Sequence, residues 1–166
     1  MNPEYTALIG RIDQMIADIE RVVNRAEYLL DKACKTGDDG YWDGIALNLH
    51  GFYAGVERIF EDIARTIDQS VPTGTTWHQD LLLQMSAKVN ALRPPVITID
   101  TRYCLDEYRG FRDLVRNVYT FHLRPARLQE LTTDLRDCTR NIQRDLKVFT
   151  HFLEQMTDAD EENEEK

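Results

Sequence analysis

Two arginines stand one helical turn apart in the stretch FRDLVRNVYTFH, residues 111–122. At about 100° per residue, one side of the helix predicted here carries four polar side chains: Arg109, Arg112, Arg116 and Tyr119. A guanidinium offers a rigid fork of donors that matches phosphate, and a neighbouring tyrosine adds a hydroxyl and a stacking surface. The pattern favours a phosphate-binding face. A carboxylate on a partner chain would compensate these charges equally well.

Arg112 lacks a carboxylate at helical spacing. Its neighbours three and four residues away are Tyr108, Arg109, Val115 and Arg116. The pair with Arg116 is repulsive by a few tenths of a kcal/mol, roughly, in an isolated helix. A solvated helix face is the ordinary explanation of such a stripe, but its charges are poorly arranged for that role. We therefore expect a compensating group outside the helix.

The charge of the chain is unevenly distributed. The net charge is −9, but the segment 158–166 contains six carboxylates and one lysine. Between residues 102 and 127 the balance reverses, with six arginines against three carboxylates. This basic segment could hold phosphates even though the whole chain repels them.

Several other kinds of site are not indicated. Helical di-metal centres need paired Glu-x-x-His motifs, and the chain has only the single reversed pair His151 and Glu154. Gly-rich phosphate loops and Gly-x-Ser-x-Gly motifs are absent from the sequence. We expect no metal and no cofactor, and we interpret the isolated His50 and His78 as structural.

Apolar residues recur every three or four positions along most of the chain, which is typical of amphipathic helices. We predict helices over about 5–33, 41–69, 76–92, 100–122 and from 124 onward. Four of them are long and joined by short connections, so the predicted fold is all-α, an up-and-down bundle of about five helices with the third as an accessory. The core face of the fourth helix should consist of Phe111, Leu114, Val115, Val118 and Phe121.

The chain has the length of one domain, predicted over 1–157, followed by an acidic disordered tail over 158–166. The three cysteines, Cys34, Cys104 and Cys138, are isolated within helical patterns, so we expect buried free thiols. Neither a membrane-spanning run nor a signal peptide is apparent, which favours a cytoplasmic protein.

The polar helix also carries a sequence resemblance. Arg112, the polar Asp113 and Tyr119 fit the signature Arg-x-x-x-x-His-x-Tyr, in which Asn117 occupies the histidine position. Together with LHGFYAGVERIFEDIA at 49–64 and WHQDLLLQM at 77–85, this stretch resembles the HEPN superfamily, in particular its HepT-like toxins. The likeness covers most of residues 1–155.

The resemblance implies an all-α homodimer with a metal-independent endoribonuclease site, in which Arg109, Arg112 and Arg116 hold RNA phosphates. An asparagine does not titrate, so Asn117 cannot act as the general base. A longer spacing allows the signature to run from Arg116 to His122, with His122 as the base and Asn117 as its polar companion. Alternatively, catalysis is weakened or lost.

The resemblance further implies a partner, a nucleotidyltransferase antitoxin of the MntA kind that attaches AMP to Tyr119. The leading interpretation is therefore the toxin of a toxin–antitoxin pair. A catalytically inactive HEPN protein that binds a nucleotidyltransferase or nucleic acid is the alternative. In a weaker third interpretation, a plain helical scaffold, the arginines only form pairs across a dimer interface.

Overall fold

The computed structural model describes residues 2–119 and 122–164, and it describes side-chain surroundings as far as residue 159. Its helices are α1 (Pro3–Thr36), α2 (Gly40–Ile63), the π-helical turn η1 (Ala64–Asp68), α3 (Trp77–Ser86), α4 (Ile99–Asn117) and α5 (Pro125–Glu164). Within these described ranges the β pairing is limited to an isolated bridge between Val89 and Arg93. The prediction of an all-α fold with about five helices is confirmed.

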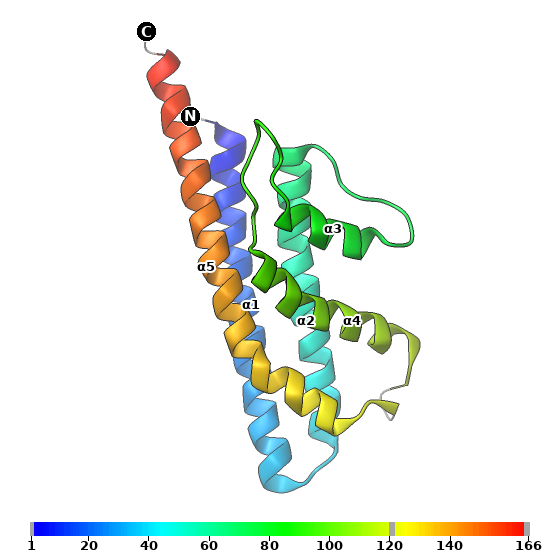
Figure 1. Cartoon of the computed structure of the whole chain (residues 1–166). Coiled ribbons are helices and arrows are strands. Elements are labelled where there is room, and N and C mark those ends of the chain that lie inside the picture. Colours follow the sequence, from blue (N-terminus) through cyan, green and yellow to red (C-terminus); the bar gives the residue numbers. More distant parts are fainter. Residues whose placement is uncertain (1, 120–121, 165–166) are drawn as a thin grey trace.

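The helices α1, α2 and α5 run side by side as the long members of the bundle (Figure 1). Asn2 caps α1 by accepting a hydrogen bond from the backbone N–H of Glu4 at 3.1 Å, and Pro3 follows as the first helical residue. Gly37 ends α1 in a left-handed conformation with φ of 71°, which costs a glycine little. The short turn that follows lets α2 return antiparallel to α1.

Two glycines of α2 allow α1 to approach closely. A Cβ atom at Gly44 would lie 3.0 Å from Leu29 Cδ1, and one at Gly55 would lie 3.2 Å from Ile19 Cγ1. Both distances are shorter than ordinary van der Waals contacts, so a side chain at either position would force Leu29 or Ile19 to shift by a few tenths of an ångström.

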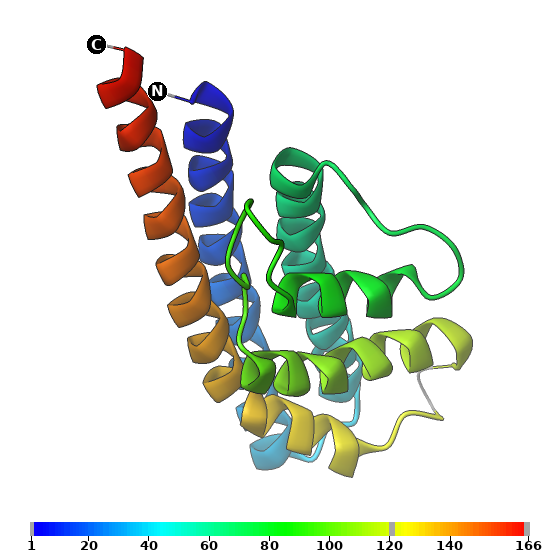
Figure 2. The same ribbon diagram turned by 45° about the horizontal axis from the view of Figure 1, so that its top comes forward.

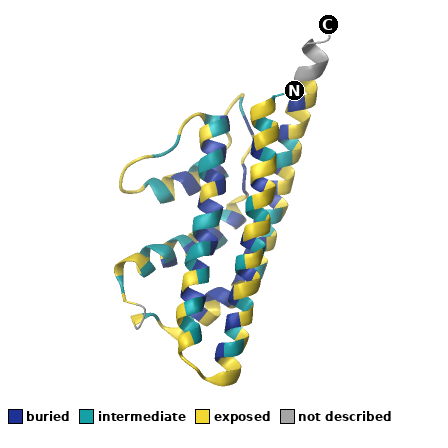
Figure 3. Cartoon of the chain, turned by 180° about the vertical axis from the view of Figure 1, so that it is seen from behind, coloured by how far each residue is buried: buried dark blue, intermediate teal, exposed yellow. Residues whose placement is uncertain are grey.

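The buried side chains form a single hydrophobic core between the helices (Figure 3). Its largest fully buried members come from α1, α2, α3, α4 and α5, and include Leu8, Phe52, Leu81, Tyr108 and Phe149. A single hydrophobic core therefore draws on all five described α-helices.

The third helix is shorter than predicted. It ends at Ser86 because Ala87 is extended, with ψ of 147°, and Val89 and Arg93 then pair their backbones in a tight turn. The fully buried Arg93 side chain holds this turn, since it binds Asp68 at 2.6 Å through both Nε and Nη2. A buried bidentate ion pair outweighs the modest helix propensity of residues 87–92.

The fourth helix crosses α2 instead of running along the bundle (Figure 2). It begins after Thr98, whose hydroxyl accepts a hydrogen bond from the N–H of Thr101, and it ends at Asn117, with Val118 extended. The prediction that it reaches His122 is therefore wrong, and residues 120 and 121 lie outside the described part.

The predicted core face of the fourth helix is only partly correct. Phe111 is buried, whereas Leu114 is 48% exposed and Val115 is half-buried. Val118 lies beyond the helix end, and Phe121 is one of the residues that are not described. Because α4 crosses the bundle at a steep inclination, its last turns extend beyond α2 (Figure 2), and Leu114 is left exposed there.

A disulfide bond joins Cys104 of α4 to Cys138 of α5. The expectation of free thiols is therefore wrong for these two residues, which the crossing of α4 and α5 brings together from 34 positions apart. Cys34 is free, as predicted, but exposed where burial was expected.

The helix α5 continues to Glu164, so it includes most of the segment 158–166 for which the sequence predicted disorder. The boundary at residue 157 stays a prediction. None of the helices in the described ranges combines the length and apolar character needed to cross a membrane.

Candidate functional site

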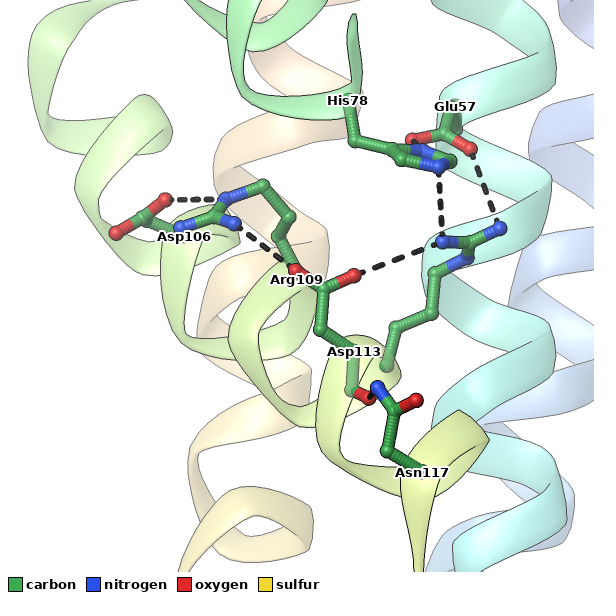
Figure 4. A network of polar contacts seen from close by, with 7 residues as sticks. Glu57, His78, Asp106, Arg109, Asp113 and Asn117 are labelled. Atoms are coloured by element: carbon green, nitrogen blue, oxygen red, sulfur yellow. Dashed lines mark hydrogen bonds and ion pairs between the residues drawn. The ribbon is translucent and has the colours of Figure 1, made fainter. Parts of the chain in front are cut away.

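Arg112 belongs to a polar cluster that joins α2, α3 and α4, and its neighbours Glu57, His78 and Asp113 are labelled in Figure 4. Its Nη1 atom is 3.2 Å from Nε2 of His78 at the start of α3. Nδ1 of the same imidazole is 2.6 Å from Oε2 of Glu57 on α2, and Glu57 Oε1 is 4.0 Å from Arg112 Nη2. The side chains of Arg112, His78 and Glu57 are only 12%, 15% and 6% exposed. The group that compensates Arg112 is thus a carboxylate of its own chain.

The hydrogen bonds assign the tautomer of His78. A guanidinium only donates, so Nε2 of His78 must accept from Arg112. The ring proton then resides on Nδ1 and is donated to Glu57. The Trp77 ring packs over the imidazole, with their centroids 3.6 Å apart. Arg112 and Glu57 therefore hold the imidazole in its plane, and Trp77 packs against its face.

The guanidinium of Arg112 keeps one unused donor. Nε is buried and, among the described residues, finds no hydrogen-bond acceptor. Asp113 adds a distant contact, with Oδ1 3.7 Å from Nη1 of Arg112. The compensating group expected outside the helix is thus Glu57 of α2, and the adjacent Asp113 adds to it from within α4.

Arg109 is paired within its own helix. Its Nε donates to Asp106 at 2.7 Å, and its Nη1 donates to Asp113 at 3.2 Å (Figure 4). The hydrogen bond with Asp106 raises the pKa of Arg109, with further contributions from the charges of both carboxylates. Asp113 thus lies between two arginines and helps to set their separation.

Asn117 is the last residue of α4. Its side-chain amide donates to the backbone carbonyl of Asp113 at 2.7 Å, one turn back along the helix (Figure 4). This bond directs the amide back along α4, so the side chain of Asn117 is engaged by the backbone of its own helix. Arg116, beside it, is exposed.

Two histidines flank the end of the arginine stripe on different sides. His50 lies on α2, and its pKa is lowered by burial and then by the positive charges of Arg112 and Arg116. The contact of Arg112 with Glu57 places this part of the stripe against α2. His122 is exposed and lines a hollow of about 480 Å³ beside Phe111 and Leu114, on a different side of α4.

Tyr119 and His122 form a second group beyond the helix end. The backbone N–H of His122 donates to the Tyr119 carbonyl at 3.0 Å, and the two rings meet edge to face with centroids 6.2 Å apart. The Tyr119 side chain is among the most exposed large hydrophobic groups of the described chain, at 71%. The structure therefore brings Arg109, Arg112, Asp113 and Asn117 into one network, and Tyr119 and His122 into another.

Sequence analysis missed Glu57 and His78 as parts of the site. A signal for Glu57 was present, because its spacing from Tyr53 and Phe60 places it on the apolar face of its helix. A carboxylate at such a position needs a charged or hydrogen-bonding partner. The identity of that partner was not readable, since His78 lies 21 residues away across a turn.

No group of three His, Cys, Asp or Glu side chains that could hold a metal ion occurs in the described part of the chain.

The comparison with protein families agrees with the motif. The model of the HepT-like protein family matches residues 44–153, a stretch that contains Glu57, His78 and the whole of α4. The chain belongs to the HepT-like family. Searches of curated proteins and of solved structures found no match. The family assignment confirms the resemblance drawn from α4, whereas the roles of individual HepT-like residues stay predictions.

Proposed function

We propose that this HepT-like protein is the toxin of a HEPN–nucleotidyltransferase pair and acts as a metal-independent endoribonuclease in the cytoplasm. The observation that carries the proposal is the environment of Arg112. This guanidinium occupies the arginine position of the family signature, touches an imidazole and retains an unused donor. Phosphodiester transfer without a metal can use a histidine as the general base and guanidinium or amide donors to stabilise the charge of the phosphorane.

The proposed reaction is an internal transfer on RNA. The 2′-oxygen attacks the adjacent phosphorus, its proton passes to a general base, and the bond from phosphorus to the 5′-oxygen breaks. The products are a 2′,3′-cyclic phosphate and a 5′-hydroxyl, whose proton comes from a general acid or water. Arg112 and Arg116 would stabilise the phosphorane charge, and Arg109 and Asp113 would support their placement. Asn117 would orient the site, and His122 is the base that the longer signature spacing proposes.

We further propose that Tyr119 is the control point. Its exposed ring is accessible to an antitoxin of the MntA kind, which would transfer AMP to the phenolic oxygen and release pyrophosphate. The added phosphate would place negative charge near Arg116 and compete with RNA. A homodimer would bring two such sites together.

This part of the proposal is tested with the nucleotidyltransferase, ATP and magnesium. We expect mass spectrometry to find one added AMP on wild-type protein and none on Tyr119→Phe. Tyr103 provides the matched control, since it is 63% exposed and lies beside Arg102, with the guanidinium carbon 5.3 Å from the ring centroid. Modification that persists in Tyr119→Phe, or disappears in Tyr103→Phe, contradicts the assignment.

A second function is favoured by Asn117. Its amide is used by the helix backbone and does not titrate, which suits a HEPN protein that binds its nucleotidyltransferase or nucleic acid without cutting. The two functions differ in a single measurable property, cleavage of RNA.

The deciding experiment incubates the purified protein with total RNA in EDTA, beside Arg116→Ala and Arg140→Ala. Arg116 is exposed, so its loss should not disturb folding, and Arg140 is a matched arginine, 69% exposed on α5. We expect Arg116→Ala to weaken cleavage and to reduce the slope of its salt dependence by about the amount due to one phosphate contact. Arg140→Ala should cleave RNA like the wild type. If folded, dimeric wild-type protein does not cut RNA, the ribonuclease proposal is wrong and the binding function is favoured.

A further inference from the structure

We propose that His78, oriented by Glu57, is the general base of the ribonuclease reaction in place of the missing motif histidine. This inference rests on the proposed function. His78 lies on α3, more than thirty positions before the signature. Only the packing of α3 against α4 brings it to Arg112.

The first support is the arrangement of the imidazole. Glu57 accepts from Nδ1 at 2.6 Å, which leaves the lone pair of Nε2 as the basic site. A carboxylate in this position holds the ring and stabilises the imidazolium that forms on proton uptake. Both side chains are largely withdrawn from water, so this interaction is weakly screened. Glu57 is thus a positioning residue and His78 the proton acceptor.

The second support is what Nε2 faces. It is 3.2 Å from Nη1 of Arg112, the group proposed to hold the phosphate. When a phosphate oxygen takes over the donors of Arg112, the Nε2 lone pair is released beside the bound phosphodiester. A base there is within reach of the 2′-hydroxyl attached to the same nucleotide.

A comparison of two buried arginines separates a structural role from a ligand-binding one. Arg93 uses its donors fully, on Asp68 and on three backbone carbonyls, those of Gln84, Ala87 and Pro94. Arg112 contacts an imidazole and two carboxylates, Asp113 at 3.7 Å and Glu57 at 4.0 Å, and its Nε has no acceptor in the described part of the chain. Arg112 therefore has fewer hydrogen-bond acceptors than donors, which suits a guanidinium that binds an oxyanion.

The other histidines fit the role less well. His122 lines the hollow beside Phe111 and Leu114, away from the Glu57 side of α4. His151 is exposed on α5, where it contacts Glu154 and Gln155. His50 lies near Arg112 and Arg116, but no hydrogen bond to its ring is found within the described ranges, so nothing fixes its tautomer.

In the proposed step, one bond forms at phosphorus and one breaks. The 2′-oxygen forms a bond to phosphorus while its proton moves to Nε2 of His78. The bond between phosphorus and the 5′-oxygen breaks, and the 5′-oxygen takes a proton from water. The imidazolium then returns its proton to the resulting hydroxide, which restores the neutral ring and leaves no net charge change.

The test measures steady-state cleavage of a fluorescent oligoribonucleotide in EDTA. The central variant is His78→Gln, whose amide can still donate to Glu57 and accept from Arg112 but cannot take up a proton. We expect kcat to fall at least about 100-fold with KM within about twofold, the size of a lost general base. His151→Gln is the matched control and should leave both constants unchanged.

Two further variants separate catalysis from folding. Glu57→Gln should lower kcat less than His78→Gln, because it removes the orienting charge but keeps the base. His78→Ala should regain activity when imidazole is added, and its circular dichroism melt in the same buffer should not change with imidazole. Recovery of activity without a change of melting temperature is not expected from a merely structural histidine.

The outcomes are distinct. Cleavage by wild type that persists within threefold in His78→Gln overturns the role of His78 and leaves the ribonuclease proposal intact. If His122→Gln alone abolishes cleavage, the longer signature spacing supplies the base and this inference is wrong. If wild type does not cleave at all, the proposed function fails and this inference fails with it.

Discussion

The ion pair between Arg93 and Asp68 holds the α3 region in place, and its removal is the most direct test of how the site is built. Arg93 is fully buried and Asp68 is 4% exposed. Asp68 accepts from Nε and Nη2 of Arg93 at 2.6 Å each, and from Gln84 Nε2 at 2.7 Å. Replacing Asp68 by Asn keeps the volume and removes the charge.

The expected loss of folding stability in Asp68→Asn follows from the burial of the ion pair. Removing one partner of a buried pair leaves an uncompensated charge and costs about 3–5 kcal/mol. The guanidinium keeps its three carbonyl acceptors, so we expect the lower end, about 3 kcal/mol. For a domain of this size that corresponds to a fall in melting temperature of roughly 6–12 °C.

The matched control is Asp62→Asn. Asp62 also forms a bidentate pair, with Arg11 at 2.7 and 3.0 Å, but that arginine side chain is 48% exposed. A pair of this kind contributes at most about 1 kcal/mol. Both variants replace an aspartate that accepts two hydrogen bonds from an arginine. The difference between their losses of unfolding free energy therefore measures the effect of burying the ion pair.

Urea unfolding and thermal melts of wild type and both variants, at one protein concentration, provide the measurement. Hydrogen exchange over residues 77–86 should also accelerate in Asp68→Asn, because α3 loses its anchor. Equal destabilisation by Asp62→Asn and Asp68→Asn would refute the reasoning, and so would unchanged exchange in α3. Since α3 carries His78, we expect Asp68→Asn to lower RNA cleavage as well.

Two further predictions concern α4. Burial and two arginine charges lower the pKa of His50, so NMR titration should place it below the ordinary histidine value and Arg116→Ala should raise it. Because the unfolded chain then binds more protons than the folded one, stability should fall as the pH drops through the ordinary value, and less steeply in Arg116→Ala. For the disulfide between Cys104 and Cys138, reduction should cost about 3–4 kcal/mol for its 34-residue separation. Thiol titration of the unfolded chain should find one group before reduction and three after it, and three before reduction would contradict the disulfide.

The sequence by itself determined the elements and the family. The spacing of apolar residues was sufficient to predict α1 and α2 as helices. The ends of α1 were also readable, since Asn2, Pro3 and Gly37 act through local backbone geometry. The signature from Arg112 to Tyr119 was readable because its residues are close in the chain, and the family match covers it.

Only the tertiary structure decided what Arg112 contacts. Glu57, His78 and Arg112 come from three helices, and none of their pairwise contacts is local in sequence. Their meeting depends on α4 crossing α2 and on a turn that a buried ion pair stabilises. A periodic pattern reports which face of a helix is apolar, but not the direction in which the next helix crosses it, because many packings bury the same face. The end of α4 at Asn117 was missed for the same reason.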